Sequence, residues 1–373
     1  MSLSTSLRDM VSRTVAAERP TVGQRAGRAL LGVGALGYGA AVRVRNAGYT
    51  LGLLPAHRLP CRVVCVGNLT VGGTGKTPTV IAVARRLRET GRTVCVLLRG
   101  YGRAGTAVEA VSDGRDILRD WRQAGDEAVL LAGSLPGVPV VVGGDRVEAG
   151  RLAVGRFGPH TILLDDGFQH RRLHRDVDVV LLDATDPFGG GRLLPLGCLR
   201  EPVSALRRAH AILVTRTDQA GDLGSLRRRL GECAPGIPVA WTIHQPCRVV
   251  DLCSGREGPP ESLQGKRVLA VSGIANPDSF HRTLRQLGAT PAKVLTFPDH
   301  HAFTREDRAR MGSEARAAGA EYILTTEKDA VRLGADLPAD APTLALGIEV
   351  KIIEGGEALE RLLGIPAGEI RRG

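Results

Sequence analysis

Lys76 and Thr77 close a glycine-rich segment whose residue types suit the binding of phosphate. The segment Val71-Gly-Gly-Thr-Gly-Lys-Thr-Pro-Thr-Val80 follows an apolar run, Arg62–Gly67, and precedes a helix-like run from Ile81. This order predicts a strand, a tight turn and a helix, in which backbone N–H groups and the helix N-terminus surround phosphate oxygens. Lys76 would reach the β- and γ-phosphates, and the Thr77 hydroxyl would bind Mg²⁺. The residues predicted to bind the nucleotide are Thr70, Val71, Gly72, Gly73, Thr74, Gly75, Lys76 and Thr77.

The alternative is a chance glycine-rich turn, because the chain holds 48 Gly and Thr70 stands where the general pattern G-x-x-x-x-G-K-T begins with Gly. The presence of Lys rather than Arg at position 76 argues for a function in phosphate binding. Only five of the 50 basic residues are Lys, so Lys76 departs from a strong bias toward Arg. A slim ammonium group fits a tight phosphate cradle that a planar guanidinium would overfill.

Asp165 and Asp166 end another apolar run, Leu163-Leu-Asp-Asp-Gly-Phe-Gln-His170. An α/β sheet presents its ligands at the carboxyl ends of its strands, and in P-loop enzymes an Asp at this place holds Mg²⁺ directly or through water. The alternative is an Asp that caps a turn. Two adjacent carboxylates in a strand would point in opposite directions, so we expect one of them to be the main ligand. The predicted metal ligands are Thr77, Asp165 and Asp166.

Five further residues could carry chemistry, each with a structural alternative. Arg99 follows a strand-like run and suits bidentate recognition of phosphate, or it is one more solvated Arg. Asp126 precedes an apolar helix, where a helix N-cap is the default and a general base is the sharper hypothesis. His300 and His301 form a weak metal motif; either is an orienting or catalytic group or part of a surface turn. Lys328 is an anion contact or one partner of a salt bridge.

The elements that must position these residues alternate between strand-like and helix-like runs after residue 60, which is typical of a parallel α/β sheet. A first series of strands is predicted at Val63–Val66, Thr93–Leu98, Val138–Val142, Thr161–Leu164, Val177–Leu182 and Ala211–Thr215. The helices between them are predicted at Pro78–Thr90, Asp126–Ala132, Arg146–Phe157 and Leu223–Leu230. A second series has strands at Val239–Ile243, Arg248–Leu252, Lys266–Ser272, Ala292–Thr296 and Tyr322–Thr325, and helices ending at Leu287 and Ala318. We therefore predict a P-loop-like domain over residues 56–237 and a smaller α/β domain over residues 238–373.

Composition narrows the class of partner. The net charge of +11 favours an anionic partner: nucleic acid, a membrane surface or a phosphorylated substrate. Aromatic residues make up only 3% of the chain and do not interleave with basic ones, which disfavours a nucleic-acid surface. The seven Cys are scattered without a C-x-x-C pair, so we expect buried, reduced thiols and no zinc site.

The first 55 residues form a basic and partly apolar segment. The apolar stretch Ala29–Val42 is shorter than the roughly 20 residues that a membrane-spanning helix needs. Residues 1–50 carry seven Arg against Asp9 and Glu18, a net charge of +5, and Arg flank the apolar stretch on both sides. Such a segment lies in the headgroup region of an anionic membrane or packs as an ordinary helix on the domain. The sequence leaves both alternatives open.

Six ordered motifs resemble one family, the tetraacyldisaccharide 4′-kinases of lipid A assembly. They are Val66-Gly-Asn-Leu-Thr-Val-Gly-Gly-Thr-Gly-Lys-Thr-Pro78, Arg99-Gly-Tyr-Gly-Arg103, Gly125-Asp-Glu127, Asp165-Asp-Gly-Phe-Gln-His-Arg171, Pro298-Asp-His300 and Thr325-Thr-Glu-Lys-Asp329. The resemblance to the family covers residues from about 28 to 350. Thr70 in place of the first P-loop glycine is itself a feature of the family.

The resemblance implies an ATP- and Mg²⁺-dependent kinase that phosphorylates the 4′-hydroxyl of an acylated glucosamine disaccharide 1-phosphate. It implies an N-terminal segment that dips into the cytoplasmic face of the bacterial inner membrane, which favours the membrane reading of residues 1–55. By the same resemblance, Asp126 would accept the hydroxyl proton, assisted by His300 from the second domain. Arg99, Tyr101, Gln169 and His170 would contact the disaccharide. We expect no nucleic-acid partner, because basic and aromatic residues do not interleave, and we predict no obligate protein partner.

Two other classes of function compete with this interpretation. One is a P-loop ATPase or GTPase that switches the binding of a protein partner, although no N/T-K-x-D signature for guanine is evident. The other is a structural protein that binds a membrane or nucleic acid by charge alone. Substituting Lys76 separates these classes, because only a nucleotide-dependent protein would lose its function.

Overall fold

The apolar runs predicted as strands form most of one large sheet. The computed structural model of the chain describes residues 21–338 and 341–366. In that part the sheet has the order β11-β10-β12-β13-β8-β7-β6-β1-β5-β2-β4-β3. Its first half consists of β1 (Arg62–Asn68), β2 (Val94–Leu98), β3 (Glu109–Ser112), β4 (Val140–Val142), β5 (Thr161–Asp165), β6 (Val177–Asp183) and β7 (Ala211–Thr215). All pair in parallel except β3 with β4, which confirms the predicted P-loop-like α/β class.

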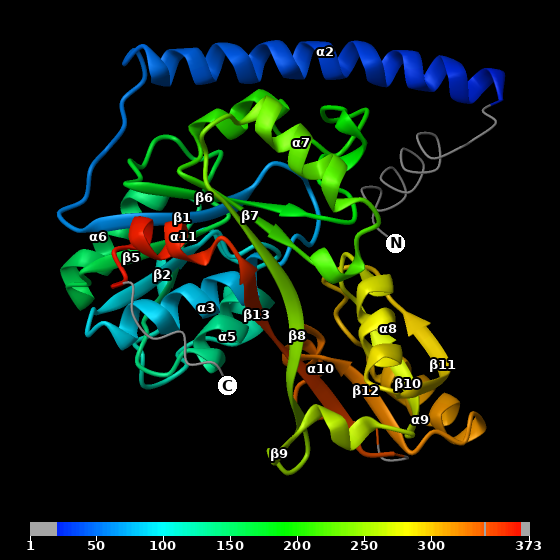
Figure 1. The fold of residues 1–373 in the computed structure, drawn as a ribbon. Helices are drawn as coiled ribbons and strands as arrows, with labels where there is room; N and C mark the ends of the chain where they lie inside the picture. Colours follow the sequence, from blue (N-terminus) through cyan, green and yellow to red (C-terminus); the bar gives the residue numbers. More distant parts are fainter. Residues whose placement is uncertain (1–20, 339–340, 367–373) are drawn as a thin grey trace.

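Helices cover both faces of this half of the sheet (Figure 1). Val64 and Val66 of β1 belong to the same buried cluster as residues of α3 (Lys76–Glu89) and α5 (Asp126–Ser134). The alternate residues Val63 and Cys65 pack in a second cluster with α6 (Arg146–Phe157) and α7 (Leu223–Cys233). Because successive strand residues point to opposite faces, a strand covered on both sides must be apolar throughout. This explains the unbroken hydrophobic runs in the sequence.

A smaller α/β body occupies the other end of the sheet. Its parallel strands are β10 (Arg267–Ser272), β11 (Thr290–Thr296) and β12 (Tyr322–Thr326). Its helices are α8 (Pro277–Gln286), α9 (Arg305–Ala317) and α10 (Glu327–Leu333). Two buried clusters fill its two faces, one around Phe280 and Leu284 and the other around Phe303 and Met311.

Two long antiparallel strands, β8 (Val239–Asp251) and β13 (Thr343–Glu354), join the two bodies (Figure 1). The start of β8 pairs with β7 and the start of β13 pairs with β12, so the sheet continues from one body to the other. The sequence had predicted two strands, Val239–Ile243 and Arg248–Leu252, where the structure has one. The register of the pair shifts beside Pro246, which interrupts the apolar pattern and lacks the N–H of a regular ladder.

The chain returns to the first body after β13. Helix α11 (Gly356–Leu363) places Leu359 and Leu363 in the same buried cluster as β1 and α3. Arg62 and Arg92 donate to the carbonyl oxygens of residues 362–364 at its end. The boundary near residue 238 stays a prediction, but this final helix packs with the first body.

Helix α2 (Val22–Thr50) spans one side of the molecule (Figure 1). Its N-terminus has a capping box: Gln24 N donates to Thr21 Oγ1, and Thr21 N donates to Gln24 Oε1. Residues 1–20 of the predicted N-terminal segment lie outside the described residues. Within residues 21–338 and 341–366, no helix is both long enough and apolar enough to cross a membrane.

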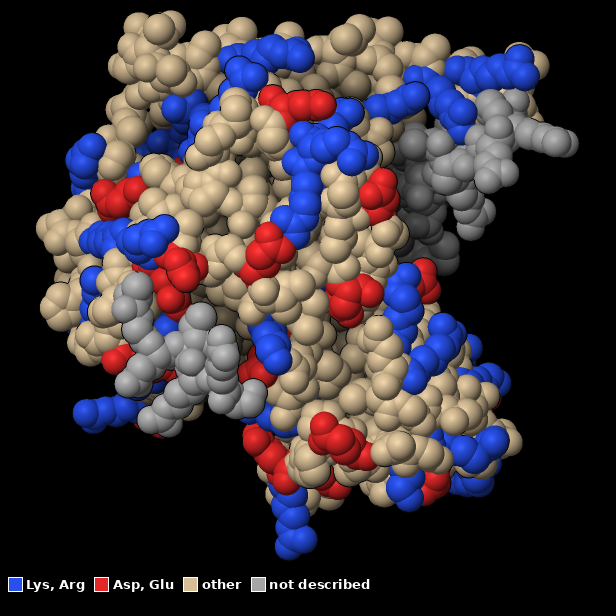
Figure 2. Space-filling model, viewed as in Figure 1, with Lys and Arg blue, Asp and Glu red and all other residues tan. Residues whose placement is uncertain are grey.

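The face of α2 that is turned away from the protein is the apolar one. Ala35, Gly39 and Val42 are buried against the body. Five large aliphatic side chains on the helix are 68–82% exposed: Val22, Leu30, Val33, Leu36 and Val44. Figure 2 shows basic side chains on this helix, all of them Arg, with uncharged surface between them. A helix in contact with water on its outer side would normally show the reverse pattern.

The seven Cys are free thiols, and only two of them, Cys65 and Cys95, are fully buried. The expectation of buried thiols is wrong for Cys198, Cys247 and Cys253, which are exposed because they lie in loops or at the bulged part of β8.

Candidate active site

A cleft of about 1440 Å³ opens between the two bodies at the carboxyl ends of the first-half strands. Most of the residues predicted from the sequence line it: Val71, Gly72, Gly73, Thr74, Gly75, Lys76, Thr77, Arg99, Tyr101, Asp165, Asp166, Gln169, His170 and His300. Two predicted residues do not. Thr70 is buried and forms a bridge to Leu199, and Asp126 lies behind His300.

The P-loop is held open from the ends of neighbouring strands. Thr215, at the end of β7, donates from its hydroxyl to Thr74 O at 3.0 Å, and Arg216 donates from Nη1 to Gly73 O at 2.9 Å. Asn68, at the end of β1, donates to the Thr74 hydroxyl at 3.0 Å. Val71 N donates to Cys198 O, but binding the loop through these oxygen atoms leaves the N–H groups after Val71 available to phosphate oxygens, as in other anion-binding loops.

Gly75 lies where no other residue type fits. It precedes α3 with φ of 84°, and a Cβ there would lie 2.6 Å from Nε2 of His244 on β8. His244 is buried and its Nε2 has no hydrogen-bond partner among the described residues. Burial and the nearby Arg216 lower the pKa of His244 to about 3, so the imidazole is neutral.

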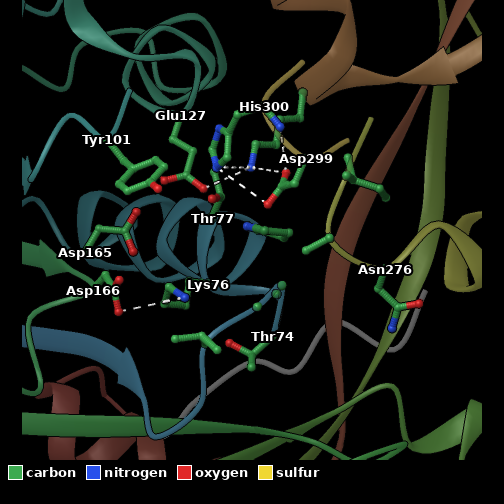
Figure 3. A pocket seen from close by; sticks show the side chains of 18 of the residues that line it. Thr74, Lys76, Thr77, Tyr101, Glu127, Asp165, Asp166, Asn276, Asp299 and His300 are labelled. Atoms are coloured by element: carbon green, nitrogen blue, oxygen red, sulfur yellow. Dashed lines mark hydrogen bonds and ion pairs between the residues drawn. The ribbon is translucent and has the colours of Figure 1, made fainter. Parts of the chain in front are cut away.

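Lys76 and the two carboxylates meet on one wall of the cleft (Figure 3). β5 ends at Asp165, and Asp166 has a left-handed φ of 52° that turns it out of the strand direction. Asp166 lies 3.8 Å from Lys76 Nζ and accepts hydrogen bonds from Arg200 at 2.8 and 2.9 Å. Both aspartates therefore line the same cleft, because the strand ends between them.

The electrostatic environments of the two aspartates differ. Burial raises the pKa of Asp165 to about 7, and the negative charge of Glu127 adds to the rise. Burial also acts on Asp166, but Lys76 and Arg200 outweigh it and hold the pKa of Asp166 below its usual range. At neutral pH Asp166 is an ionised partner of two cations, while Asp165 is poised to gain or lose a proton.

Asp126 and His300 form a dyad that bridges the two bodies. Asp126 begins α5, and His300 follows β11 in the other body; its Nδ1 lies 3.0 and 2.9 Å from the two carboxylate oxygens. Asp126 is 3% exposed and also accepts a hydrogen bond from Arg332 at 2.9 Å. Burial alone would raise the pKa of Asp126, but the hydrogen bond from His300 and the charges of Lys328 and Arg332 hold it below its ordinary value.

The structure also separates the two adjacent histidines. His301 stacks on Phe297 with ring centroids 4.8 Å apart and bonds to Asp307 at 2.8 Å, so it fixes the start of α9. His300 has a left-handed φ of 59°, which turns its ring away from that cluster and toward Asp126 and Tyr101. The geometry thus places His300, and not His301, beside Asp126.

Lys328 completes the cluster around His300. Its Nζ donates to Glu127 at 3.2 Å and to Asp299 at 3.4 Å, and lies 3.4 Å from His300 Nε2. These carboxylates and Asp126 raise the pKa of Lys328 although burial opposes the rise. The salt-bridge alternative for Lys328 is therefore what the structure shows, with both partners at the cleft.

The remaining predicted contacts lie next to Asp166. Gln169 donates to Asn68 O at 2.8 Å, and Nε2 of His170 is buried without a partner among the described residues. Burial, followed by the charge of Arg146, lowers the pKa of His170 to about 4. Arg146 itself is buried at the cleft wall and donates from Nη1 to Gly143 O and Gly144 O. A neutral imidazole and a buried cation thus face the same part of the cleft.

Four Arg residues at the site, Arg146, Arg200, Arg216 and Arg332, were not predicted. They belong to an Arg-rich composition in which no single Arg stands out. Arg200 and Arg332 act on site residues that are distant in sequence. Only their position relative to an acidic partner distinguishes them, and that position depends on the fold.

The donor set suits a hard divalent cation that is also held by phosphates. Asp165 Oδ1 is buried and has no hydrogen-bond partner among the described residues, and Thr77 and Asp166 line the same wall. Within the described part of the chain no group of three His, Cys, Asp or Glu side chains could hold a metal by itself. Mg²⁺ sites in nucleotide enzymes need only one or two carboxylates because phosphates and water supply the other ligands.

Comparisons with known proteins agree with this geometry. Residues 27–365 match the family model described as tetraacyldisaccharide-1-P 4′-kinase, LpxK. The chain is 45% identical to the tetraacyldisaccharide 4′-kinase of Anaeromyxobacter sp. (strain K), covering 93% of this chain and 92% of that protein. It is 44% identical to the enzyme of the same name from Syntrophus aciditrophicus (strain SB), covering 87% and 89%.

A solved structure extends the agreement to the fold. The crystal structure of LpxK from Aquifex aeolicus in complex with ATP superposes with a TM-score of 0.72 at 34% identity, covering 90% of this chain and 98% of that one. A family match over most of the chain, together with a shared fold and a P-loop cleft, decides the assignment: the chain belongs to the LpxK family of tetraacyldisaccharide 4′-kinases and is an ATP-dependent kinase.

Proposed function

We propose that the protein transfers the γ-phosphate of ATP to the 4′-hydroxyl of a tetraacylated glucosamine disaccharide 1-phosphate, at the cytoplasmic face of the inner membrane. The observation that carries the proposal is the joint lining of one cleft by the P-loop, the aspartate pair and His300, in a chain that belongs to this kinase family. The names of its relatives, tetraacyldisaccharide 4′-kinases, indicate the substrate.

The P-loop would hold the triphosphate. Its N–H groups, directed by the bonds from Thr215 and Arg216, and the Lys76 ammonium group would surround the β- and γ-phosphates. Thr77 and Asp165, with Asp166 beside them, would hold Mg²⁺. When bound, Mg²⁺ neutralises charge on the phosphate oxygens. Arg200 and Lys76 keep Asp166 ionised, so this wall would keep its charge throughout turnover.

The Asp126–His300 dyad would accept the proton of the attacking hydroxyl. Phosphoryl transfer to an alcohol needs a proton acceptor on the side of the cleft that faces the γ-phosphate. The dyad lies across the cleft from the P-loop, with Tyr101 against the His300 ring at a centroid distance of 5.3 Å. Arg99, Tyr101, Gln169 and His170 would bind the disaccharide. Their polar atoms include the buried and unpartnered Nε2 of His170, which suits a sugar hydroxyl.

Helix α2 would place the enzyme at the bilayer. Its outward aliphatic side chains suit the acyl region, and the basic residues beside them suit anionic headgroups. The hydrogen bond from Tyr38 to Arg200 O connects this helix to the residue that holds Asp166. The acyl chains could then stay in the membrane while the sugar enters the cleft.

The test is a transfer assay with γ-labelled ATP, Mg²⁺ and tetraacyldisaccharide 1-phosphate dispersed in detergent. We expect label in the lipid fraction with wild-type protein and nearly none with Lys76→Ala. An acceptor whose 4′-hydroxyl is blocked should remain unlabelled. Label released only as inorganic phosphate, at a rate unaffected by the lipid, would contradict the proposal.

A further inference from the structure

Arg332 is a buried cation at the seam between α5 and α10. Its side chain is 1% exposed, and its two terminal nitrogens bond to groups from different parts of the chain. Nη1 donates to Asp126 Oδ2 at 2.9 Å. Nη2 donates to Gly273 O at 2.8 Å and also to Asp329. One guanidinium therefore joins Asp126 of the first body to a loop and a helix of the second.

Asp329 completes the arrangement. It is fully buried, accepts from Gly273 N at 3.1 Å and accepts from the Thr326 hydroxyl at 2.7 Å. Both backbone groups of Gly273 are thus fixed by the Arg332–Asp329 pair. Two residues further on, Ala275 packs against the P-loop, where a Cβ on Gly73 would lie 3.3 Å from the Ala275 Cβ. The pair connects the P-loop side of the cleft with Asp126.

The bonds leave Asp126 little freedom to turn. Oδ1 accepts from Glu127 N at 2.9 Å, both oxygens lie within 3.0 Å of His300 Nδ1, and Oδ2 accepts from Arg332. A guanidinium binds in a fixed planar fork, so it sets direction as well as charge, which a Lys ammonium does not. A buried ion pair contributes little net stability compared with apolar residues of similar volume. We therefore assign the Arg332–Asp126 pair a role in orienting the carboxylate.

We propose that Arg332 is a positioning residue of the kinase reaction, which acts through Asp126 by fixing the direction of its carboxylate and keeping it ionised in a buried site. This inference rests on the proposed role of the Asp126–His300 dyad. Arg332 does not line the cleft, so it would act on neither substrate directly.

The charges around Asp126 determine what the loss of Arg332 would do. Glu127 follows it in α5; Asp299 and His300 face it from the loop before α9; Lys328 and Asp329 face it from α10; Tyr101 lies against His300. Lys328 is shared with Glu127 and Asp299. Without Arg332, Asp126 would share its surroundings with an unneutralised Asp329, and its pKa would rise.

The experiment compares the pH profiles of kcat for wild type, Arg332→Met and Arg332→Lys. ATP and Mg²⁺ are kept at saturating concentrations, so that competition between protons and Mg²⁺ at Asp165 does not contribute to the pH profile. For Arg332→Met we expect the acid limb of the kcat profile, where protonation of Asp126 stops turnover, to move up by about one pH unit or more. We also expect kcat at pH 7 to fall at least about tenfold. Arg332→Lys should keep the limb near its wild-type position and recover only part of kcat, because it retains the charge without the fork.

The matched control is Arg308→Met. Arg308 packs on the same helix, donating to Leu333 O at 2.8 Å and Phe303 O, but does not contact Asp126. It should leave the acid limb unchanged. An acid limb that stays in place in Arg332→Met, whatever the loss of rate, or that moves equally in Arg308→Met, would overturn the inference.

A second variant covers the case in which Arg332→Met does not fold. Arg332→Met combined with Asp329→Asn removes both members of the buried pair and leaves no unpaired charge at position 329. An upward shift of the acid limb is again expected, smaller than in Arg332→Met because position 329 no longer carries a charge, and an unshifted limb would again overturn the inference. If the wild-type protein phosphorylates no lipid, the proposed function fails; if it does and the limb is unmoved, only the role of Arg332 fails.

Discussion

Asp126 has too many bonds for a simple helix cap. An N-cap side chain usually accepts one bond from a backbone N–H two or three residues later. Asp126 instead accepts from its neighbour Glu127 and from two side chains of the second body, His300 and Arg332. Since α5 already begins at Asp126, the carboxylate serves the interdomain cluster. This favours the general-base hypothesis over the capping alternative.

We predict that Asp126→Asn lowers kcat by about 10²–10⁴-fold, the range typical of a lost general base. Nucleotide binding should be largely kept, since Asp126 does not line the cleft. Steady-state kinetics with the lipid acceptor and equilibrium binding of an ATP analogue measure the two effects. The control is Asp120→Asn, because Asp120 only caps α4 (Trp121–Ala124) through Gln123 N. Unchanged turnover in Asp126→Asn would return this residue to a structural role.

Asp165 gives a prediction about pH and stability. Its pKa is about 7 in the folded protein, against 3.8 for an ordinary Asp, because burial disfavours its charge. Between these values the folded state keeps a proton that the unfolded chain has released, so this group lowers stability as the pH rises from about 4 to about 7. Asp165→Asn cannot ionise. In Mg²⁺-free buffer it should therefore raise the melting temperature by a few degrees at pH 8, and change it little at pH 4.

Thermal unfolding at the two pH values tests this prediction, with the transfer assay run in parallel. The Asn variant should be inactive even though it is more stable, as expected when a charge is kept for function. Adding Mg²⁺ and an ATP analogue should stabilise wild type more than the variant. If the variant melts below wild type at pH 8, the ionised Asp165 carboxylate does not destabilise the folded protein, and the prediction is wrong.

The site residues that could be predicted are those whose role is indicated by their immediate neighbours in the sequence. Gly72 to Thr77 form a contiguous loop, and Asp165 and Asp166 end an apolar run, so spacing alone pointed to them. Arg200 and Arg332 could not be found in this way. Their partners are 34 and 206 residues distant, and only the pairing of strands and the α5–α10 seam bring them together.

At the scale of elements, α2 is held to the body by small residues. Gly32, Gly34 and Gly39 face the loop at residues 193–196, and a Cβ on Gly39 would lie 2.8 Å from Leu193 Cδ1. Asn46 and Arg45 bond to the buried Glu201 at 2.8 and 3.1 Å. Close packing on this side fixes the rotation of the helix, and the rotation turns the aliphatic row outward.

We predict that Leu30→Ser, Val33→Ser and Leu36→Ser together weaken binding to anionic vesicles at least tenfold. Each of these side chains would contribute up to about 1.5–3 kcal/mol if it were fully buried in the acyl region, and a loss of about 1.4 kcal/mol is already tenfold. Turnover of a short-chain, water-soluble acceptor should change little. Vesicle co-sedimentation measures the binding. The control is Ile352→Ser with Ile353→Ser, two exposed residues of β13. Equal sedimentation of all three proteins would remove the membrane proposal.

The elements that the sequence predicted well are those with one uniform pattern. β7 and α6 have the predicted bounds because continuous apolar runs and a capped amphipathic helix are unambiguous. β13 and α10 were missed. β13 is buried at its start and exposed at its end as it passes from one body to the other, so neither periodicity holds along its length. α10 is only seven residues long and lies directly after β12.

At the scale of the whole molecule, the described part of the chain crosses between the bodies twice and returns to the first body. β8 leads out of the first body and β13 leads back, and α11 then packs beside β1 and α3 (Figure 1). The second body is therefore an insertion whose two connecting strands are paired with each other along their length. A two-stranded connection between the bodies suits a cleft that must admit a nucleotide and then close to exclude water.

Helix α11 should therefore be needed to stabilise the first body although it lies far from the cleft. Leu359 and Leu363 are 4% and 3% exposed within the core around β1. Substituting both with Ala should cost about 4–10 kcal/mol, since each buried Leu→Ala costs about 2–5 kcal/mol. That is a large part of the 5–15 kcal/mol typical of a whole domain.

Urea unfolding monitored by circular dichroism tests this expectation, and Arg361→Ala is the control on the same helix. Arg361 is 66% exposed and only approaches Glu357 at 4.0 Å, so its loss should change stability by less than about 1 kcal/mol. If the double Leu variant unfolds at the wild-type urea concentration, α11 contributes little to the stability of the first body. If it unfolds early while Arg361→Ala does not, the first body is completed only when the last helix has docked.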